Sequence, residues 1–217
     1  LSSLPVPSFP RLTETVRGRV RGAAAHFGFE RGADGDPPAA RLVRLLDAFE
    51  ADLVVDVGAR AGRFGGELRR AGYRGRIASF EPLDVPRRHL ERAAAQDDAW
   101  SVLPYALGDG TGEARRLDEL WEQVVAPGER AFLKLDVRDH ASRVLRGAGE
   151  HADELTGLQV RTSFAGPQAD GLLFDEALTL ARGTLGMSLM SLVPGPADPS
   201  SGRLLRCDLV LFRKDAL

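Results

Sequence analysis

Strand-like and helix-like segments alternate along most of this chain, and that alternation limits its fold more than any other feature. Short apolar runs predict strands at 52–57, 76–81, 100–106, 131–136, 157–163, 187–193 and 204–212. Apolar residues spaced three or four apart predict helices at 61–71, 84–95, 117–125, 140–150 and 171–184. Such alternation is typical of an α/β fold, in which helices cover both faces of a parallel sheet.

The last two predicted strands depart from this rule. The residues between them, PGPADPSSG, favour a turn and contain no helical pattern. A short connection of this kind joins antiparallel neighbours. We therefore expect a seven-stranded, mostly parallel sheet with an antiparallel last strand.

The start of the chain has a different character. Residues 1–10 hold three prolines and predict an irregular lead-in, and residues 11–30 have weak helical character. Asp36, followed by two prolines, predicts the cap of a helix that apolar residues continue to Phe49. The sequence thus predicts an N-terminal extension with a short helix over 1–38 and one domain over 39–217.

Composition narrows the function classes. Hydrophobic residues make up 43% of the chain, enough for a core, and no apolar run approaches the roughly 20 residues of a membrane span. The first ten residues lack the basic start of a signal peptide. A net charge of −2 gives no general attraction to nucleic acid or membranes. Cys207, the single cysteine, excludes a disulfide framework and predicts a cytoplasmic setting.

The sharpest motif is VVDVGARAG at 54–62, an apolar strand that runs into a glycine turn and a helix. Gly58 permits a tight turn and a close approach of a ligand to the main chain, and Gly62 leaves room at the first helical turn. The spacing does not match the dinucleotide fingerprint or a phosphate-binding loop. An acid at Asp56, just before the turn, favours a ligand with a cationic amino group.

Glu81 supports a nucleotide-type pocket. It ends the second predicted strand, near the interval of about 20 residues at which an acid binds ribose hydroxyls in nucleotide-binding folds. A carboxylate can accept two hydrogen bonds from a cis-diol. A side chain of Arg60 that fills the turn, or a Glu81 carboxylate that points away from it, would contradict this hypothesis.

At this point the sequence resembles the FkbM family of S-adenosylmethionine-dependent methyltransferases. The resembling stretches are VVDVGARAGRFGGELRRAGYRGRIASFEP (54–82), WSVLPYALGDGTGE (100–113), RLDELW (116–121), FLKLDV (132–137) and GRLLRCDLVLF (202–212). The resemblance implies a Rossmann-like class I methyltransferase fold. It also implies S-adenosylmethionine as cofactor and methyl transfer to a small-molecule hydroxyl, often of a sugar or another natural product.

The resemblance also assigns roles to residues. Asp56, Gly58, Ala59 and Gly62 would hold the methionine end of the cofactor, and Glu81 its ribose. The turn that contains Ala106, Leu107 and Asp109 would hold the adenine. Asp136, at the end of the fourth predicted strand, would face the reacting methyl group.

Three positions depart from the family. Arg60 replaces an asparagine, the Gln-Gly-x-Glu tract after LKLDV reads Arg-Asp-His-Ala at 138–141, and Arg161 replaces a glutamate. Arg161 reverses the charge expected at the mouth of the pocket. We therefore expect either an anionic acceptor or a protein that has lost methyl transfer. The second alternative is a degenerate methyltransferase-like protein that acts as a binding or partner subunit or catalyses another reaction.

A general base is expected just past the fourth predicted strand. His140 is the best-placed candidate, because an imidazole titrates near neutral pH. A solvated histidine on the following helix is the competing interpretation. Asp136 and Asp139 are alternatives, and Asp139 is also suited to cap that helix.

The remaining motifs give no further site. No metal-ligand pattern is present, and Trp100, Trp121 and Cys207 are predicted to be buried. The balanced charge also disfavours a nucleic-acid acceptor. The oligomeric state stays open, with a homo-oligomer among the options.

Overall fold

The computed structural model describes residues 36–137, 140–164 and 172–213. Residues 1–35 lie outside the described residues, so the short helix expected in the N-terminal extension stays a prediction. The helices are α2 (Pro38–Ala48), α3 (Arg63–Ala71), α4 (Asp84–Ala94), α5 (Trp121–Val124), α6 (Ala141–Gly147) and α7 (Phe174–Gly183). Two 3-10 helices are η1 (Asp118–Leu120) and η2 (Gly149–Asp153).

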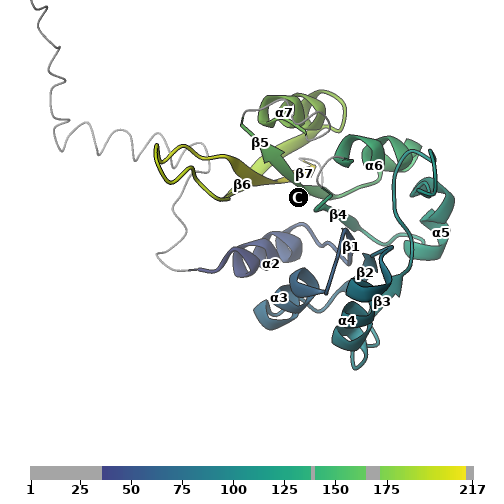
Figure 1. Ribbon diagram of the computed structural model, residues 1–217. Helices are drawn as coiled ribbons and strands as arrows, with labels where there is room; N and C mark the ends of the chain where they lie inside the picture. The colour runs from purple at the N-terminus through teal and green to yellow at the C-terminus, as the bar shows by residue number, and fades with distance from the viewer. Residues whose placement is uncertain (1–35, 138–139, 165–171, 214–217) are drawn as a thin grey trace, which may run out of the picture. The chain divides into compact units, whose positions relative to one another are not determined.

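One sheet organises the domain. Its strands are β1 (Leu53–Val57), β2 (Arg76–Phe80), β3 (Trp100–Leu103), β4 (Ala131–Leu135), β5 (Gly157–Ser163), β6 (Met187–Pro194) and β7 (Arg206–Arg213). Their order is β3-β2-β1-β4-β5-β7-β6, and β7 runs antiparallel to both of its neighbours. The predicted seven-stranded sheet with an antiparallel last strand is confirmed (Figure 1).

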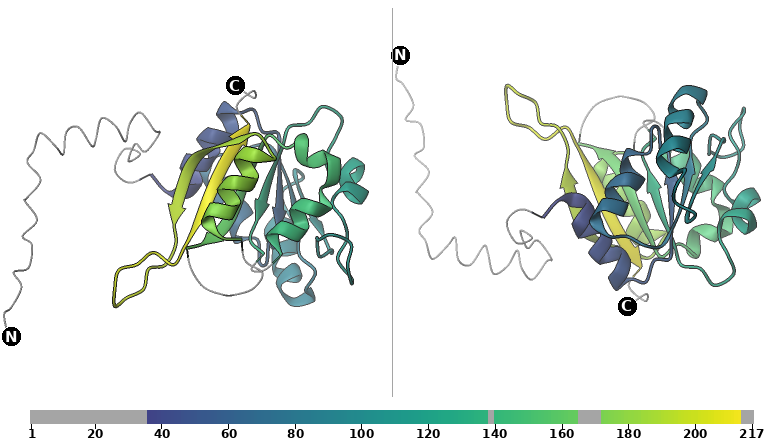
Figure 2. Two further views of the ribbon diagram at one scale, coloured as in Figure 1. Left: turned by 90° about the horizontal axis from the view of Figure 1, so that it is seen from above. Right: turned by 90° about the horizontal axis from the view of Figure 1, so that it is seen from below.

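Helices cover both faces of this sheet. The helices α2, α3 and α4 lie on one face, and α5, α6 and α7 lie on the other (Figures 1 and 2). Each face has its own apolar core. Phe212 lies in the first core, where its ring stacks on Phe49 at 4.3 Å and meets Phe132 at 5.2 Å between centroids. Trp121 lies in the second core with Leu133 and Leu135.

Several predicted details change in the structure. The strand predicted at 100–106 ends at Leu103, because Pro104 follows and cannot donate to the ladder. The expected cap at Asp36 is wrong: Pro37 is the N-cap of α2, and the carboxylate of Asp36 forms an ion pair with Arg44 at 2.8 Å. The helix predicted at 140–150 ends at Gly147, and η2 begins two residues later at Gly149, whose φ is positive.

The predicted buried residues are confirmed. Trp100 and Trp121 belong to the two cores, and the indole of Trp100 donates to the hydroxyl of Ser79 at 2.9 Å. Cys207 is buried on β7 beside Thr162, and burial raises the pKa of its thiol. It is a small apolar side chain of the core rather than a reactive thiol.

Candidate functional site

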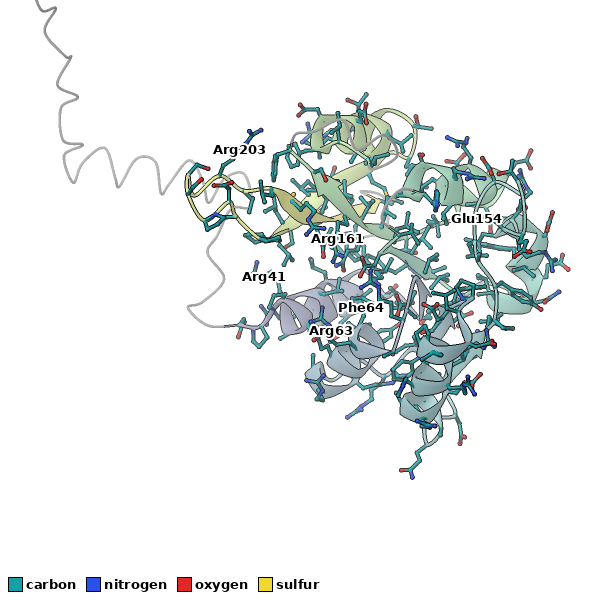
Figure 3. All side chains as sticks on the ribbon, viewed as in Figure 1. Arg41, Arg63, Phe64, Glu154, Arg161 and Arg203 are labelled. Atoms are coloured by element: carbon teal, nitrogen blue, oxygen red, sulfur yellow. The ribbon has the colours of Figure 1, made fainter. Side chains whose placement is uncertain are left out.

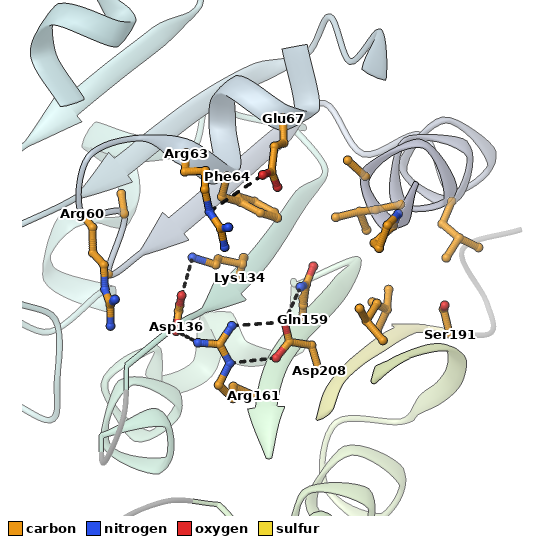
Figure 4. A pocket seen from close by; sticks show the side chains of 18 residues that line it. Arg60, Arg63, Phe64, Glu67, Lys134, Asp136, Gln159, Arg161, Ser191 and Asp208 are labelled. Atoms are coloured by element: carbon orange, nitrogen blue, oxygen red, sulfur yellow. Dashed lines mark hydrogen bonds and ion pairs between the residues drawn. The ribbon is translucent and has the colours of Figure 1, made fainter. Parts of the chain in front are cut away.

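A cavity of about 340 Å³ lies at the carboxyl ends of β1, β4 and β5, on the face that α2 and α3 cover. Its outer wall is apolar and comes mainly from Leu42 and Leu45 of α2 and Phe64 of α3. Its opposite wall comes from the sheet and carries Val193 and Val210 beside polar side chains. We call five of these polar residues the cavity floor; Figure 4 shows their side chains, Lys134, Asp136, Gln159, Arg161 and Asp208.

Strand register explains why these polar groups meet. Asp56 is paired with Lys134 on β4, and Lys134 with Gln159 on β5. Side chains two residues apart on a strand share a face. The row Val54 and Phe132, which belongs to the apolar core, is therefore followed on the same face by the row Asp56, Lys134 and Gln159. The core thus gives way to a polar surface where the parallel strands end.

A buried ion pair joins Lys134 of the floor to Asp56 beneath it. The ammonium of Lys134 lies 2.8 Å from Oδ1 of Asp56, 3.9 Å from Oδ2 of Asp136 and 4.8 Å from the ring centroid of Phe64. Asp56 is 0% exposed, and its Oδ2 has no hydrogen-bond partner. The carboxylate predicted to meet a ligand's amino group therefore meets Lys134 instead, and it does not line the cavity.

Arg161 lies between two carboxylates. It donates through Nε to Asp208 at 2.9 Å, and its Nη1 forms a short contact with Asp136 (Figure 4). Burial alone would lower the pKa of Arg161, but the hydrogen bonds and charges of Asp208 and Asp136 outweigh it and raise that pKa above its usual value. Its positive charge is thus neutralised within the protein, and Arg161 does not create the anion site that the sequence suggested.

The turn after β1 is closed by its own hydrogen bonds. The main-chain N–H groups of Gly58 and Ala59 both donate to the carbonyl of Phe80. Gly58 has a φ of 77°, and a Cβ there would lie 2.7 Å from the carbonyl oxygen of Asp136. Gly62 precedes α3, and a Cβ there would meet Leu90 at 2.8 Å. Close packing thus explains why both positions are glycine. The N–H groups of Gly58 and Ala59 are not available to a ligand, because both already donate to Phe80.

Glu81 directs its carboxylate at this turn. Its Oε2 accepts the N–H of Arg60 at 2.9 Å, and its Oε1 accepts the N–H of Leu83 at 3.0 Å. Glu81 is only 4% exposed. The side chain of Arg60 is exposed and lies at the edge of the cavity (Figure 4). Neither of the two arrangements that would contradict a nucleotide-type pocket is present.

The turn at 106–109 lies elsewhere. Leu107 is buried, and the carboxylate of Asp109 accepts from Arg143 at 3.0 Å and from Arg146 at 3.3 Å. A hydrogen bond from Thr111 and those two arginines hold the pKa of Asp109 well below its usual range. Ala106, Leu107 and Asp109 do not line the cavity.

Among the base candidates, Asp136 lines the cavity and His140 does not. His140 is exposed at the N-cap of α6, where its side chain makes no capping hydrogen bond. Asp139 lies outside the described residues. Of the predicted site residues, the structure therefore brings together Gly58, Ala59 and Asp136 on the cavity wall.

Besides Lys134, which was not predicted either, two further floor residues were missed, Gln159 and Asp208. A sequence signal for both exists, because each is a polar residue inside a strand whose neighbours are apolar. Their role depends on β7 lying beside β5, and the sequence pattern does not indicate that these two strands are neighbours.

The described residues show no metal centre or membrane span. Over 36–137, 140–164 and 172–213, no three His, Cys, Asp or Glu side chains are grouped to hold a metal ion. Within the same residues, no helix has the length and apolar character needed to cross a bilayer.

Comparison with known proteins gives structural likeness only. No protein-family model matches the chain, and no curated protein matches its sequence. A 1,6-didemethyltoxoflavin-N1-methyltransferase of Burkholderia thailandensis, solved with S-adenosylhomocysteine, has 14% identity and a TM-score of 0.50, over 96% of this chain and 93% of that one. An rRNA methylase of Streptococcus thermophilus has 13% identity and a TM-score of 0.50, over 83% and 99%.

A chain of the fibrillarin/Nop5p complex is similar to the same degree, with 12% identity and a TM-score of 0.50 over 81% of this chain and 83% of that one. At such identities the likeness shows the fold. The chain has the Rossmann-like class I methyltransferase fold, as the sequence predicted.

Proposed function

We propose that this protein is an S-adenosylmethionine-dependent methyltransferase that methylates a hydroxyl of a small molecule, as the resemblance to FkbM enzymes implies. The fold supports the reaction class. The single observation that carries the proposal is the carboxylate of Glu81, which ends β2 and is directed at the turn after β1. In an open α/β sheet, ligands bind at this edge.

The residues present fit the cofactor. When bound, S-adenosylmethionine supplies an activated methyl group on a sulfonium. Each oxygen of Glu81 accepts one N–H, and a carboxylate oxygen can accept a second hydrogen bond, so a ribose diol can be held there. Gly58 and Ala59 line the cavity, whereas Glu81 lies behind their turn and is not part of the cavity lining.

We assign the acceptor hydroxyl to Asp136. Its Oδ1 is held by Arg161, whereas its Oδ2 lies 3.9 Å from Lys134, beyond hydrogen-bond distance. Oδ2 can therefore accept a hydrogen bond from the hydroxyl and would take its proton on methyl transfer. We favour Asp136 over His140 because only Asp136 of these two lines the cavity.

One observation favours the alternative of a degenerate protein. The N–H groups of Gly58, Ala59 and Arg60 all donate within the protein. If this closed turn excludes the cofactor, the fold serves as a binding or partner subunit. Cofactor binding decides between the two.

Calorimetry with S-adenosylmethionine and S-adenosylhomocysteine tests the proposal. We expect the unaltered protein to bind both, and Glu81→Gln to weaken binding roughly 10- to 100-fold, because one charge-assisted hydrogen bond is worth about 1.5–3 kcal/mol. Methyl transfer is then read as formation of S-adenosylhomocysteine when a panel of sugars and other hydroxyl compounds is added.

The matched control is Glu91→Gln, which changes an exposed glutamate on α4. It should leave cofactor affinity unchanged, and melting curves establish that both variants are folded. No binding of either ligand to the unaltered protein at millimolar concentration would overturn the proposal in favour of the degenerate alternative.

A further inference from the structure

We propose that the acceptor carries a positively charged amine, and that Gln159 and Asp208 bind this amine on the cavity floor. The inference rests on the proposed function only in naming the ligand as the acceptor. The amine site itself exists whether or not a methyl group is transferred.

The first argument is charge. The floor and the aspartate beneath it hold three carboxylates, Asp56, Asp136 and Asp208, against the two cations Lys134 and Arg161. An uncompensated charge in a partly buried site is costly, and a bound cation removes that cost. The remaining lining cations, Arg60 and Arg63, are exposed at the edge, where water and salt screen them.

The second argument is an unpartnered acceptor. Gln159 is 9% exposed, and its Nε2 donates to Oδ2 of Asp208 at 3.4 Å. This contact fixes the amide orientation, since the opposite orientation would place the amide oxygen against a carboxylate. Oε1 of Gln159 is buried without a hydrogen-bond partner, Gln159 lines the cavity, and in Figure 4 this oxygen points away from Asp208. This amide oxygen therefore requires a hydrogen-bond donor from a ligand.

The third argument is that both cations of the floor are already paired with carboxylates. Lys134 is paired with Asp56 at 2.8 Å, and Arg161 with Asp208 and Asp136. Among these residues and Gln159, the buried polar atoms without a hydrogen-bond partner are Oδ2 of Asp56 and Oε1 of Gln159, and both are acceptors. An ammonium has donors and no acceptor, so it fits this floor better than a neutral hydroxyl, which brings both.

Position separates this site from the cofactor. Gln159 lies two strands from β1, and Asp208 lies three strands away. With strands spaced about 4.8 Å apart, these groups lie about 10 and 14 Å across the sheet from the glycine turn. The apolar wall of Leu42, Leu45 and Phe64 faces them. The expected acceptor is therefore a small amphipathic amine with a neighbouring hydroxyl.

A matched pair of probes tests this chemistry. The protein, saturated with S-adenosylhomocysteine, is titrated at pH 7 with trans-2-aminocyclohexanol, whose amine is protonated, and with trans-cyclohexane-1,2-diol, and both are followed by NMR. We expect the amino alcohol to bind at least tenfold more tightly. Equal affinities, tighter binding of the diol, or no binding of the amino alcohol at 20 mM would overturn the proposal.

Two variants locate the binding. Gln159→Leu and Asp208→Asn should each weaken binding of the amino alcohol at least fivefold and leave binding of S-adenosylhomocysteine within twofold. Asp84→Asn, an exposed aspartate on α4, is the control and should change neither. A parallel loss of cofactor affinity in both floor variants would show that these groups serve the cofactor, and the proposal would be wrong.

The two proposals fail separately. If the amino alcohol also binds the protein without cofactor while S-adenosylmethionine does not bind, the proposed function fails and the amine site stands. If the cofactor binds and the amino alcohol does not, the reverse holds. Melting curves of each variant exclude loss of the fold as the cause.

Discussion

At the scale of single residues, Gly58 is restricted both by its backbone conformation and by its neighbours. Its φ of 77° is unfavourable for residues with a side chain, and an added Cβ would lie 2.7 Å from the carbonyl oxygen of Asp136. We expect Gly58→Ala to lower the free energy of unfolding by about 2–4 kcal/mol, as strain and overpacking combine. Urea unfolding followed by circular dichroism measures this loss.

Gly66 provides the matched control. It lies inside α3, and a Cβ there would meet nothing within 4 Å. Gly66→Ala should stabilise the protein by about 0.5–1 kcal/mol, because alanine is the better helix former. Equal destabilisation by both substitutions would contradict the special role of the turn.

At the scale of elements, Arg69 joins the end of α3 to the segment before β3. Its guanidinium donates to Asp97 at 2.6 Å and to the carbonyls of Tyr73 at 2.9 Å and Gly75 at 2.7 Å. The hydrogen bond from Arg69 is the main cause that lowers the pKa of Asp97. We expect Asp97→Asn to cost about 1 kcal/mol of unfolding free energy at pH 7.

The pH dependence follows from that direction. The unfolded pKa of an aspartate is about 3.9, and the folded pKa of Asp97 is lower, so its stabilisation is present above the unfolded value and is lost as pH falls through the folded value. The difference between the unaltered protein and Asp97→Asn should therefore shrink at pH 3 in urea titrations. Asp98→Asn, at the exposed neighbouring position, should show no such pH-dependent difference. A constant difference from pH 7 to pH 3 would contradict the role of the pair.

At the scale of the whole molecule, one sheet joins two cores, each with one tryptophan. Phe212 is fully buried in the core that contains Trp100, and Trp121 lies in the other. Phe212→Ala should lower the free energy of unfolding by about 3–5 kcal/mol. Since β1 and β4 alternate side chains into both cores, both should unfold together.

Single-tryptophan backgrounds measure this coupling. In Trp121→Phe, fluorescence reports the core of Phe212, and in Trp100→Phe it reports the opposite core. Phe212→Ala should shift the urea midpoint equally in both backgrounds. A shift seen only through Trp100 would show that the two faces unfold independently.

Local pattern was sufficient to predict the architecture. Apolar runs and their spacing predicted all seven strands, and the turn-rich link before 204–212 predicted the antiparallel last strand. Glu81 was also accessible from the sequence, because the end of a strand and its distance from the glycine turn fix where its side chain lies. These features depend on residues close in the chain or on strand ends that share one edge of the sheet.

The charge of the cavity was decided by tertiary structure. The sequence suggested an anion site at Arg161, yet this side chain is paired with Asp136 from β4 and Asp208 from β7. Asp56 and Lys134, 78 residues apart, are paired in the same way. Hydrophobic periodicity predicts which residues form strands, but it carries no information on which strands are neighbours. Ion pairs between strands depend on that arrangement, because charges interact strongly only within a few ångströms. The sequence by itself thus determined the sheet and the edge at which the proposed site lies, and only the packing of β7 against β5 determined how the charges of the cavity are paired.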